Sequence, residues 1–418
     1  MRHTTTRYVV VALLGILLIS LILPLLDGLD AFGYANERTY LIIFQDNSEI
    51  RNTGGIMACM GLLTVYHGSV TSLQVFYANS TYLNGTVKVD GPESLTKFFN
   101  VTSARLFDSN VQYNFSSFAP VVQANLYNLT GKRVDGTVAV DFTAVQELMK
   151  LTGPIIVSGD VITSENVVDR LHYYSSISQG EKSPLTDLLH ALALDIIGDV
   201  RGSSLPAKLA FLTTAQQLMK EGHLQFYLPG NSLLQSFESA QKRPAGDFIS
   251  IIDANLGSAK ADFGVNRTVS DDVTIFADGS TISNLTITYI NHCWWQYNVF
   301  STVLVPPGAE LIAVRNSTRA FEGPLITNGT GFSAFSAHLG VLAGSTASVT
   351  YVYKLPKNVH GNGIGNHYDL YFEKQAGINE YTLNTTVELP QGSTVIKTEN
   401  VGVNQTSMED IHAQVIYT

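Results

Sequence analysis

The stretch of sequence that decides the fold is TYLIIFQDNSEIRNTGG, residues 39–55. Its first part, Thr39–Phe44, is a short run of apolar, β-branched and aromatic residues, which is the pattern of a buried strand. The polar segment Gln45–Gly55 follows and predicts a turn. Further along the chain, the pattern predicts strands at residues 62–65, 70–77 and 137–140, and helices at residues 144–151, 165–173, 183–197 and 204–219. This alternation of strands and helices predicts an α/β domain over residues 36–264.

Residues 78–135 are rich in loop-forming residues and predict an exposed insertion with one short helix near residues 94–99. From about residue 248 the helical periodicity disappears, and short alternating segments are separated by Gly, Pro and Asn. That pattern predicts an antiparallel β-sandwich, which we assign to residues 265–418. Its strands are expected at residues 274–277, 284–290, 301–305, 310–314, 348–353, 368–372 and 381–389.

The N-terminal region has the pattern of a membrane anchor. Residues 8–26 form an uncharged apolar run of the length that a transmembrane helix needs. Arg2 and Arg7 precede this run, so the positive-inside bias leaves residues 1–7 in the cytoplasm and the bulk of the chain outside the cell membrane. A cleaved signal peptide and a buried core helix remain open as alternatives.

N-glycosylation sequons are more frequent than chance allows. With 26 Asn and 71 Ser or Thr among 418 residues, chance predicts about four Asn-x-Ser/Thr sequons, and eleven occur, all after the apolar run. Attached glycans would keep a surface with few charges soluble. An Asn- and Thr-rich turn composition without glycans is the alternative. The sequon asparagines are Asn79, Asn84, Asn100, Asn114, Asn128, Asn266, Asn284, Asn316, Asn328, Asn384 and Asn404.

The composition excludes several classes of protein. Charged residues make up only 14% of the chain, and the net charge of −10 argues against binding to nucleic acid. Two cysteines, Cys59 and Cys293, are too few for a disulfide scaffold or a cysteine-rich metal module. Two separately buried thiols are expected, and a disulfide between them outside the cell is the alternative. The ten histidines form no HxxxH pair, so no metal site is assigned. Many sequons with few cysteines favour an archaeal cell surface.

The turn after the first strand is the candidate functional site, because ligands bind at loops that follow the strands of α/β sheets. Asp46 and Glu49 are the candidate catalytic base or acid residues. Arg51 has the chemistry to hold a phosphate or carboxylate, and a glycine pair allows backbone N–H groups to approach an anion closely. A structural turn in which a Glu–Arg pair only holds the loop is an equally open reading. The ligand-binding candidates in this turn are Asn47, Arg51, Thr53, Gly54 and Gly55.

One aromatic cluster in the second domain allows two interpretations. Trp294 and Trp295, with Tyr297 close by, are expected to pack in the core of a sandwich strand. The alternative is a patch on which a glycan stacks.

The sequence resembles the bacterial and archaeal membrane-anchored proteins of domain-of-unknown-function family 4012. The resemblance begins at TYLIIFQDNSEIRNTGG and continues through VDGTVAVDFTAVQELMKLTGPIIV, ITSENVV and DANLGSAKAD, and it extends to VPPGAEL, YKLP and EKQAG. It spans most of residues 36–395 and implies the architecture of an anchored α/β domain followed by a sandwich. The family has no established activity.

A weaker similarity is to the LytR-CpsA-Psr family, which transfers glycopolymers from polyprenyl diphosphate carriers to cell walls. It rests on the apolar strand, the polar Asp/Arg turn and the strand–helix unit that follows. This similarity implies a LytR-CpsA-Psr-like α/β domain, a diphosphate held by arginine, and Mg²⁺ as the cofactor of such a ligand. The arginine-rich motifs that bind the diphosphate in that family are not recognisable here. Arg170 and Lys260 are candidates to supply the missing positive charge.

These observations lead to two hypotheses for function. The first is a single-pass extracellular cell-envelope protein that binds or transfers polyprenyl-diphosphate-linked surface glycan through the turn at residues 46–55. The second is a non-catalytic structural or adhesive component of the cell surface, with envelope proteins or surface glycan as partners. The two hypotheses differ in one expectation: a transferase needs Arg51 in an open cationic cleft, whereas a structural protein has Arg51 and Glu49 buried and paired with each other.

Overall fold

The computed structural model describes residues 33, 36–77, 83, 85–88, 103–178, 183–229, 246–255, 257, 260–317, 325–329, 331–357 and 366–418. The described chain divides into two compact units, each with its own core. Among the described residues, the first unit contains most of the chain up to residue 229, and the second contains residues 48–52 and the chain from residue 246 onward. The boundary therefore falls before β10 (Asp247–Asn255) and not near residue 265, because β10 is an inner strand of the sandwich.

The first unit is an α/β structure, and its elements follow in chain order. They are β1 (Arg38–Arg51), β2 (Gly54–Tyr66), β3 (Ser69–Tyr77), β4 (Thr86–Lys88), β5 (Ser103–Arg105), η3 (Leu106–Asp108), α3 (Phe115–Thr130), β6 (Gly136–Asp141), α4 (Phe142–Thr152), β7 (Ile155–Val157), β8 (Asp160–Ile162), α5 (Val167–Ile177), α6 (Pro184–Gly202), α7 (Leu205–Lys220) and β9 (Leu224–Tyr227).

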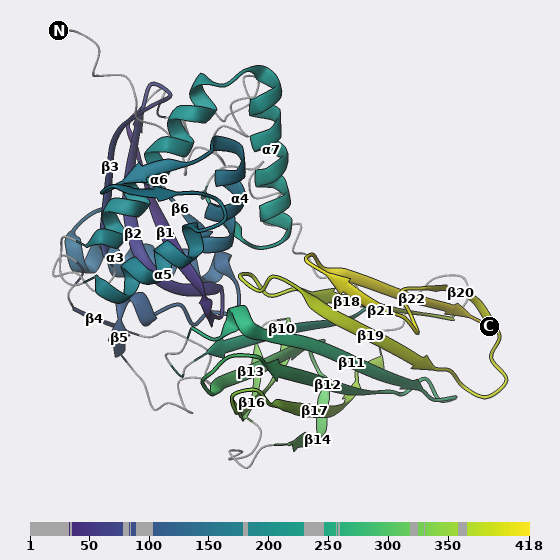
Figure 1. Ribbon diagram of the computed structural model, residues 1–418. Helices are drawn as coiled ribbons and strands as arrows, with labels where there is room; N and C mark the ends of the chain where they lie inside the picture. Colours follow the sequence, from purple (N-terminus) through teal and green to yellow (C-terminus); the bar gives the residue numbers. More distant parts are fainter. Residues whose placement is uncertain are drawn as a thin grey trace, which may run out of the picture. The chain divides into compact units, whose positions relative to one another are not determined.

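A five-stranded sheet with the order β3-β2-β1-β6-β9 forms the centre of this unit. β1 and β6 run parallel, with Tyr40 opposite Gly136 and Gln45 opposite Asp141, whereas β3 and β9 pair antiparallel with their neighbours. Alternate residues of β1 point into two different cores. One core contains residues of α3, and the other contains residues of α4, α5, α6 and α7, so the sheet lies between two helical layers (Figure 1).

Most predicted elements of the first unit are present, with three corrections. The strand that begins the fold does not end at Phe44, since β1 continues to Arg51 and the predicted turn shrinks to Asn52 and Thr53. The segment 78–135 contains the long helix α3, which its loop-like composition concealed, while residues 94–99 lie outside the described residues. Helix α5 begins after Asn166, two residues later than expected.

The second unit consists of strands and one short 3-10 helix. Its elements are β10, η5 (Asp262–Gly264), β11 (Val265–Ile275), β12 (Thr281–Asn291), β13 (Tyr297–Val305), β14 (Glu310–Asn316), β15 (Leu325–Gly329), β16 (Phe332–Val341), β17 (Thr346–Leu355), β18 (Asn366–Glu373), β19 (Tyr381–Glu388), β20 (Val395–Glu399), β21 (Asn404–Ser407) and β22 (Ile411–Tyr417).

Two sheets enclose the core of this unit, with the orders β15-β16-β13-β10-β18-β22-β20 and β14-β17-β12-β11-β19-β21. Alternate residues of the strands, such as those of β11 and β12, are buried between the sheets, which is the sandwich pattern that the sequence predicts. The sandwich is not purely antiparallel, because β10 pairs parallel with β18 and β11 pairs parallel with β19.

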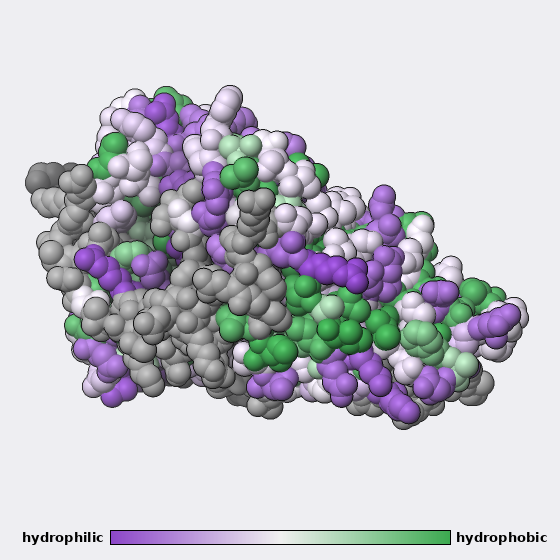
Figure 2. Space-filling model, turned by 90° about the horizontal axis from the view of Figure 1, so that it is seen from below, coloured by the Kyte–Doolittle hydropathy of each residue, from purple (hydrophilic) through white to green (hydrophobic). Residues whose placement is uncertain are grey.

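The surface contains few charges and several exposed apolar groups. Figure 2 shows a continuous hydrophobic area on one face of the protein, bordered by hydrophilic residues. No helix within the described part of the chain combines the length and apolarity of a membrane span. The run at residues 8–26 lies outside the described residues, and its assignment as an anchor stays a prediction.

The core of the sandwich contains two carboxyl groups without a cation among their hydrogen-bond partners. Asp247 accepts a hydrogen bond from Tyr368 Oη at 2.6 Å, and Asp271 accepts one from Ser283 Oγ at 2.5 Å. Burial raises the pKa of Asp271 to about 7, and burial together with Asp271 raises the pKa of Asp247 well above its usual value. Both side chains therefore favour the neutral, protonated form in the folded protein.

This pKa shift predicts a pH-dependent stability. Between about pH 4 and pH 7 the folded state retains the Asp271 proton that the unfolded chain has released, so the free energy of unfolding falls as the pH rises through this window. Asp271→Asn is expected to reduce the slope by up to about 1.4 kcal/mol per pH unit. Urea unfolding from pH 5 to pH 8 measures this slope. Asp272→Asn, on the outward face of the same strand, removes a carboxylate that only adds to the effect of burial on the Asp271 pKa, so a much smaller loss of slope is expected. An equal loss of slope in both variants would contradict the assignment.

Candidate functional site

The hairpin that joins β1 to β2 requires its two glycines for close packing. Gly54 has a φ of +122°, and a Cβ atom there would lie 2.4 Å from Gln45 Oε1. At Gly55 a Cβ atom would lie 2.2 Å from the backbone carbon of Asp46. The glycine pair therefore lets β2 start against the end of β1, a role that accounts for both residues without a bound anion.

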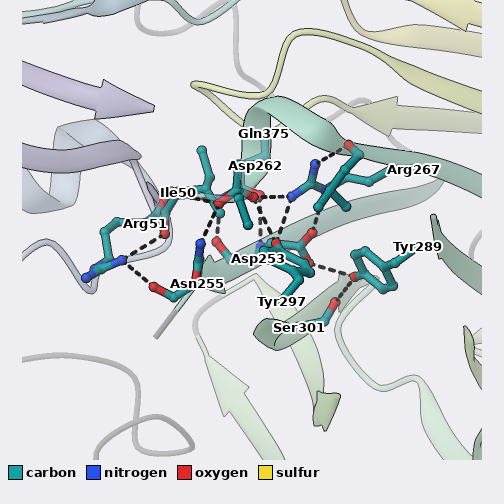
Figure 3. Close-up of polar contacts among 12 residues, drawn as sticks. Ile50, Arg51, Asp253, Asn255, Asp262, Arg267, Tyr289, Tyr297, Ser301 and Gln375 are labelled. Atoms are coloured by element: carbon teal, nitrogen blue, oxygen red, sulfur yellow. Dashed lines mark hydrogen bonds and ion pairs between the residues drawn. The ribbon is translucent and has the colours of Figure 1, made fainter. Parts of the chain in front are cut away.

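The tip of this hairpin, residues 48–52, belongs to the second unit. Ile50 is fully buried and is part of the apolar core of the sandwich. Its backbone N–H donates to Asp262 Oδ2 at 3.0 Å, and the carbonyl of Arg51 accepts from Gln375 Nε2 at 3.0 Å. The segment at residues 48–52, which the sequence predicts to be a turn, is therefore a buried part of the sandwich unit (Figure 3).

Arg51 and Glu49 form a buried ion pair. Arg51 Nη2 lies 2.8 Å from Glu49 Oε1, and the side chains are only 6% and 10% exposed. The other end of the guanidinium, Nη1, donates to the carbonyl oxygens of Ile50 and Asn255. These contacts place Arg51 and Glu49 away from solvent, which is the arrangement expected of a structural hairpin rather than of an open diphosphate site.

A buried network of polar side chains holds Asp262, the hydrogen-bond partner of the Ile50 N–H, in place. Arg267 donates to Asp253 at 2.9 Å and to Asp262 at 2.5 Å, and Tyr297 Oη donates to Asp262 at 2.9 Å (Figure 3). Tyr289 Oη lies 2.8 Å from a carboxylate oxygen of Asp253. Burial lowers the pKa of Arg267, but Tyr297 and the two carboxylates outweigh burial and raise it well above its usual value, so the guanidinium stays charged.

Three of the sequence motifs that carry the family resemblance meet at this network. The motif DANLGSAKAD supplies Asp253, Asn255 and Asp262, and EKQAG supplies Gln375. Asn255 Nδ2 donates to Asp262 Oδ2 at 2.8 Å, and the Asp253 backbone N–H donates to Gln375 Oε1 at 2.8 Å. These motifs, remote from one another in the sequence, converge on the hairpin tip within the second unit.

Asp46 and Asn47 remain in the first unit, directly after the part of β1 that pairs with β6. Asp46 is fully buried, and its Oδ1 lies 3.1 Å from Nε2 of His172 on α5. Asn47 Nδ2 donates to Thr143 Oγ1 at 2.9 Å. The ring of His172 is partly exposed, with 21% of its side chain accessible. Asp46 is therefore a candidate to orient a histidine base rather than to act as a base itself.

A second carboxylate–histidine pair lies at the carboxyl end of β6. Asp141 Oδ1 caps α4 by accepting from the Ala144 N–H at 2.8 Å, while its Oδ2 lies 2.5 Å from His223 Nδ1. Both side chains are buried, and His223 Nε2 has no partner within the described chain. Asp141 and Thr143 are both suited by sequence to cap the helix predicted at residues 144–151, and the structure shows that Asp141 is the cap. The histidine beside it was not predicted.

The two additional cationic candidates belong to different units. Arg170 lies on α5 in the first unit, and its Nη1 is 3.6 Å from Asp160 Oδ2 in a partly exposed pair. Lys260 lies in the second unit, between β10 and η5. Thr53, the last turn candidate, is buried in the first unit, where its hydroxyl donates to Asn110 Oδ1.

None of the eight sequon asparagines within the described residues is buried. Four are exposed, and the other four are intermediate in exposure. Three sequons fall outside the described residues. Exposed are Asn128, Asn266, Asn328 and Asn404; intermediate are Asn114, Asn284, Asn316 and Asn384; outside are Asn79, Asn84 and Asn100.

The prediction for the two cysteines is confirmed, whereas the prediction for the aromatic cluster is confirmed only in part. Cys59 and Cys293 are both buried and are not joined by a disulfide, as expected. Tyr297 is fully buried in the sandwich core, but Trp294 is 92% exposed and Trp295 is 42% exposed. The expectation that both tryptophans pack in the core is therefore wrong. They lie in the loop between β12 and β13, where the strand pattern does not continue.

The close approach at Gly55 predicts a large effect of adding a single methyl group. Gly55→Ala would place a Cβ atom against backbone that cannot move without separating the hairpin strands, and we expect a loss of about 3 kcal/mol in the free energy of unfolding. Chemical denaturation measures this loss. Gly198→Ala in α6 is the control, because no atom lies within 4 Å of its Cβ position and alanine favours helix. Equal stability of the two variants would contradict the account of the hairpin.

Comparison with known proteins adds limited information. No curated protein sequence matches the chain. Similar solved structures include the protein gbs0355 of Streptococcus agalactiae (13% identity, 53% of this chain and 79% of that chain, TM-score 0.33). Others are a transcriptional regulator of Bacillus subtilis (10%, 50% and 78%, TM-score 0.25) and an M1 zinc metallopeptidase of Deinococcus radiodurans (11%, 38% and 43%, TM-score 0.20). The family whose model matches is DUF4012, a protein of unknown function, over residues 35–174, which contain the hairpin and the strands and helices up to α5.

Proposed function

We propose that this chain is a single-pass, membrane-anchored, extracellular component of a cell envelope with a structural or adhesive role. In this proposal the hairpin at residues 46–55 is a structural element, the surface is N-glycosylated, and the partners are surface glycan or envelope proteins. The N-terminus is cytoplasmic and the bulk of the chain is outside the cell.

The observation that carries the non-catalytic part is the state of Arg51. Its guanidinium is buried, pairs with Glu49 and donates to two backbone carbonyl groups. Moving this charge to a diphosphate would leave Glu49 as a buried, unpaired carboxylate, which costs several kcal/mol. The energetics therefore favour Arg51 as a fixed part of the sandwich unit.

Two features support the extracellular location. The apolar run at residues 8–26 has the length of a membrane span and basic residues on the side that stays in the cytoplasm. In addition, four of the eight sequon asparagines within the described chain are exposed, as carriers of a bulky glycan must be. A surface with so few charges would gain its solubility from those glycans.

A second candidate function is transfer of glycan from a polyprenyl diphosphate carrier, and one observation favours it. His172 is held by the buried carboxylate of Asp46, next to the carboxyl end of the parallel strand β6, and such strand ends are where α/β sheets bind ligands. A histidine with one nitrogen fixed by a carboxylate and part of its ring accessible is suited to take a proton from an acceptor hydroxyl. Mg²⁺ would be the cofactor of this reaction, as a counter-ion of the diphosphate.

The variant Arg51→Ala distinguishes the structural role from the glycan transferase. We expect the variant to lose about 3–5 kcal/mol of unfolding free energy, because Glu49 is left as a buried unpaired charge. Urea denaturation measures the loss. Arg170→Ala is the matched control, since that guanidinium is partly exposed and its removal should cost less than about 1 kcal/mol.

The same variant is tested for binding of undecaprenyl diphosphate in detergent. A structural role predicts that any binding by the folded fraction of Arg51→Ala equals that of the wild type. A variant that folds with wild-type stability but loses binding of the diphosphate would overturn the structural assignment and favour the transferase, with His172→Gln as the next variant.

Sequon occupancy tests the location directly. We expect glycopeptides at Asn128, Asn266, Asn328 and Asn404, whose side chains are exposed, in protein purified from its own membranes. Mass spectrometry of protease digests, before and after chemical deglycosylation, measures the occupancy of each site. Protein expressed in the cytoplasm of a heterologous host, where no glycans are attached, is the control. Unmodified asparagine at all four sites in the native protein would contradict the proposal of a glycosylated surface.

A further inference from the structure

The loop between β12 and β13 exposes both tryptophans of the chain. Trp294 has 92% of its surface accessible and Trp295 has 42%, whereas Tyr297, two residues later, is fully buried. Tryptophan has a large apolar surface and is usually found at least partly buried. A pair of adjacent exposed tryptophans is therefore unfavourable in the free protein unless a ligand covers it.

The loop is held rigidly by one buried side chain. Nδ2 of Asn291 donates to the carbonyl oxygens of Trp295 at 2.9 Å, Val341 at 3.1 Å and Leu342 at 3.2 Å, and its Oδ1 accepts from the Cys293 N–H at 2.9 Å. Asn291 thus connects the tryptophan loop to the turn between β16 and β17. Because both loops are fixed before any ligand arrives, binding would lose little conformational entropy.

Two planar amide side chains follow the tryptophans directly in the sequence. Gln296 Nε2 donates to Asn298 Oδ1 at 2.6 Å, and a Cβ atom at Gly340 would lie 2.7 Å from the same Gln296 nitrogen. The side chain of Gln296 therefore lies over the bare backbone of β16, where it remains exposed. Its Oε1 and its second N–H provide an acceptor and a donor within the same loop.

The surroundings of the pair are almost free of charge. Phe263 and Leu342 lie on the adjoining loops and are 66% and 63% exposed. In the described residues of these loops, 260–264, 291–298 and 340–345, the Lys, Arg, Asp and Glu residues are Lys260 and the buried Asp262. A charged partner or an anionic lipid surface would be matched by a cluster of opposite charge, which these loops lack.

We propose that Trp294 and Trp295 form a binding platform for a neutral saccharide chain of the cell envelope. The C–H faces of sugar rings would cover the indole rings, and the sugar hydroxyls would exchange hydrogen bonds with Gln296 and Asn298. Uncharged aromatic and amide groups match a ligand with apolar faces and many hydroxyls. This inference rests on the proposed function, because it supplies a glycan ligand for a protein of the cell surface.

The two tryptophans make the platform directly measurable. Because the chain contains only these two, tryptophan fluorescence of the full-length protein in detergent reports on this loop alone. The probes are hexasaccharides of glucose, mannose and N-acetylglucosamine, together with the neutral polysaccharide fraction of the source cells' envelope. We expect a saturable blue shift with at least one probe. For that probe, Trp294→Ala is expected to weaken binding about tenfold, as measured by calorimetry.

Phe276→Ala is the matched control, because Phe276 is an exposed aromatic residue in the turn at the opposite end of the β11–β12 hairpin. It should bind like the wild type, and Trp294→Ala should unfold at the wild-type temperature since its ring is already in solvent. Absence of binding to every saccharide probe would overturn the proposal. So would a blue shift produced only by phosphatidylglycerol vesicles, or only by self-association at high protein concentration.

The two proposals fail in different ways. Digestion of intact cells by added protease reports on the extracellular location and is independent of the tryptophans. An accessible protein that binds no saccharide would end this inference and leave the proposed function intact. An inaccessible protein would remove the proposed function, whatever the fluorescence shows.

Discussion

The buried polar network of the second unit depends on the hydrogen bond from the Ile50 backbone N–H to Asp262. Asp262 is buried, so its charge is tolerable only because Arg267, Asn255 and Tyr297 also bind it. Through these contacts Asp262 is connected to the start of β11 by Arg267, to the end of β10 by Asn255 and to the start of β13 by Tyr297. A short segment from early in the sequence therefore completes a polar network that strands from much later in the chain cannot satisfy alone.

The elements that follow from local chemistry could be predicted from the sequence. The apolar run Thr39–Phe44 lies in the central strand, and Asp141 caps the helix that its position predicts. The function of the hairpin could not be predicted in the same way. A polar arginine after a buried strand has the same sequence pattern whether it binds a phosphate or a glutamate, and only the burial of Arg51 and Glu49 distinguishes the two.

The histidine partners of Asp46 and Asp141 could not be predicted from sequence patterns for a related reason. His172 lies 126 positions from Asp46, and His223 lies 82 positions from Asp141, so no spacing rule connects them. Trp294 illustrates the opposite error. Aromatic residues next to an alternating strand usually belong to the core, but here the strand ends at Asn291 and the loop carries the rings outward. Burial depends on where a strand ends, which composition does not fix.

The placement of residues 48–52 in the second unit has a consequence for the order in which the protein is made. These residues are synthesised about 200 positions before β10, and their last partner, Gln375, follows 324 positions after Arg51. Until the later strands of the second unit are made, Ile50 and the Arg51–Glu49 pair lack the residues that bury them in the native protein. Such long-range closure slows folding. A chain released prematurely would have an unprotected hairpin tip, at which proteases could cleave incomplete molecules.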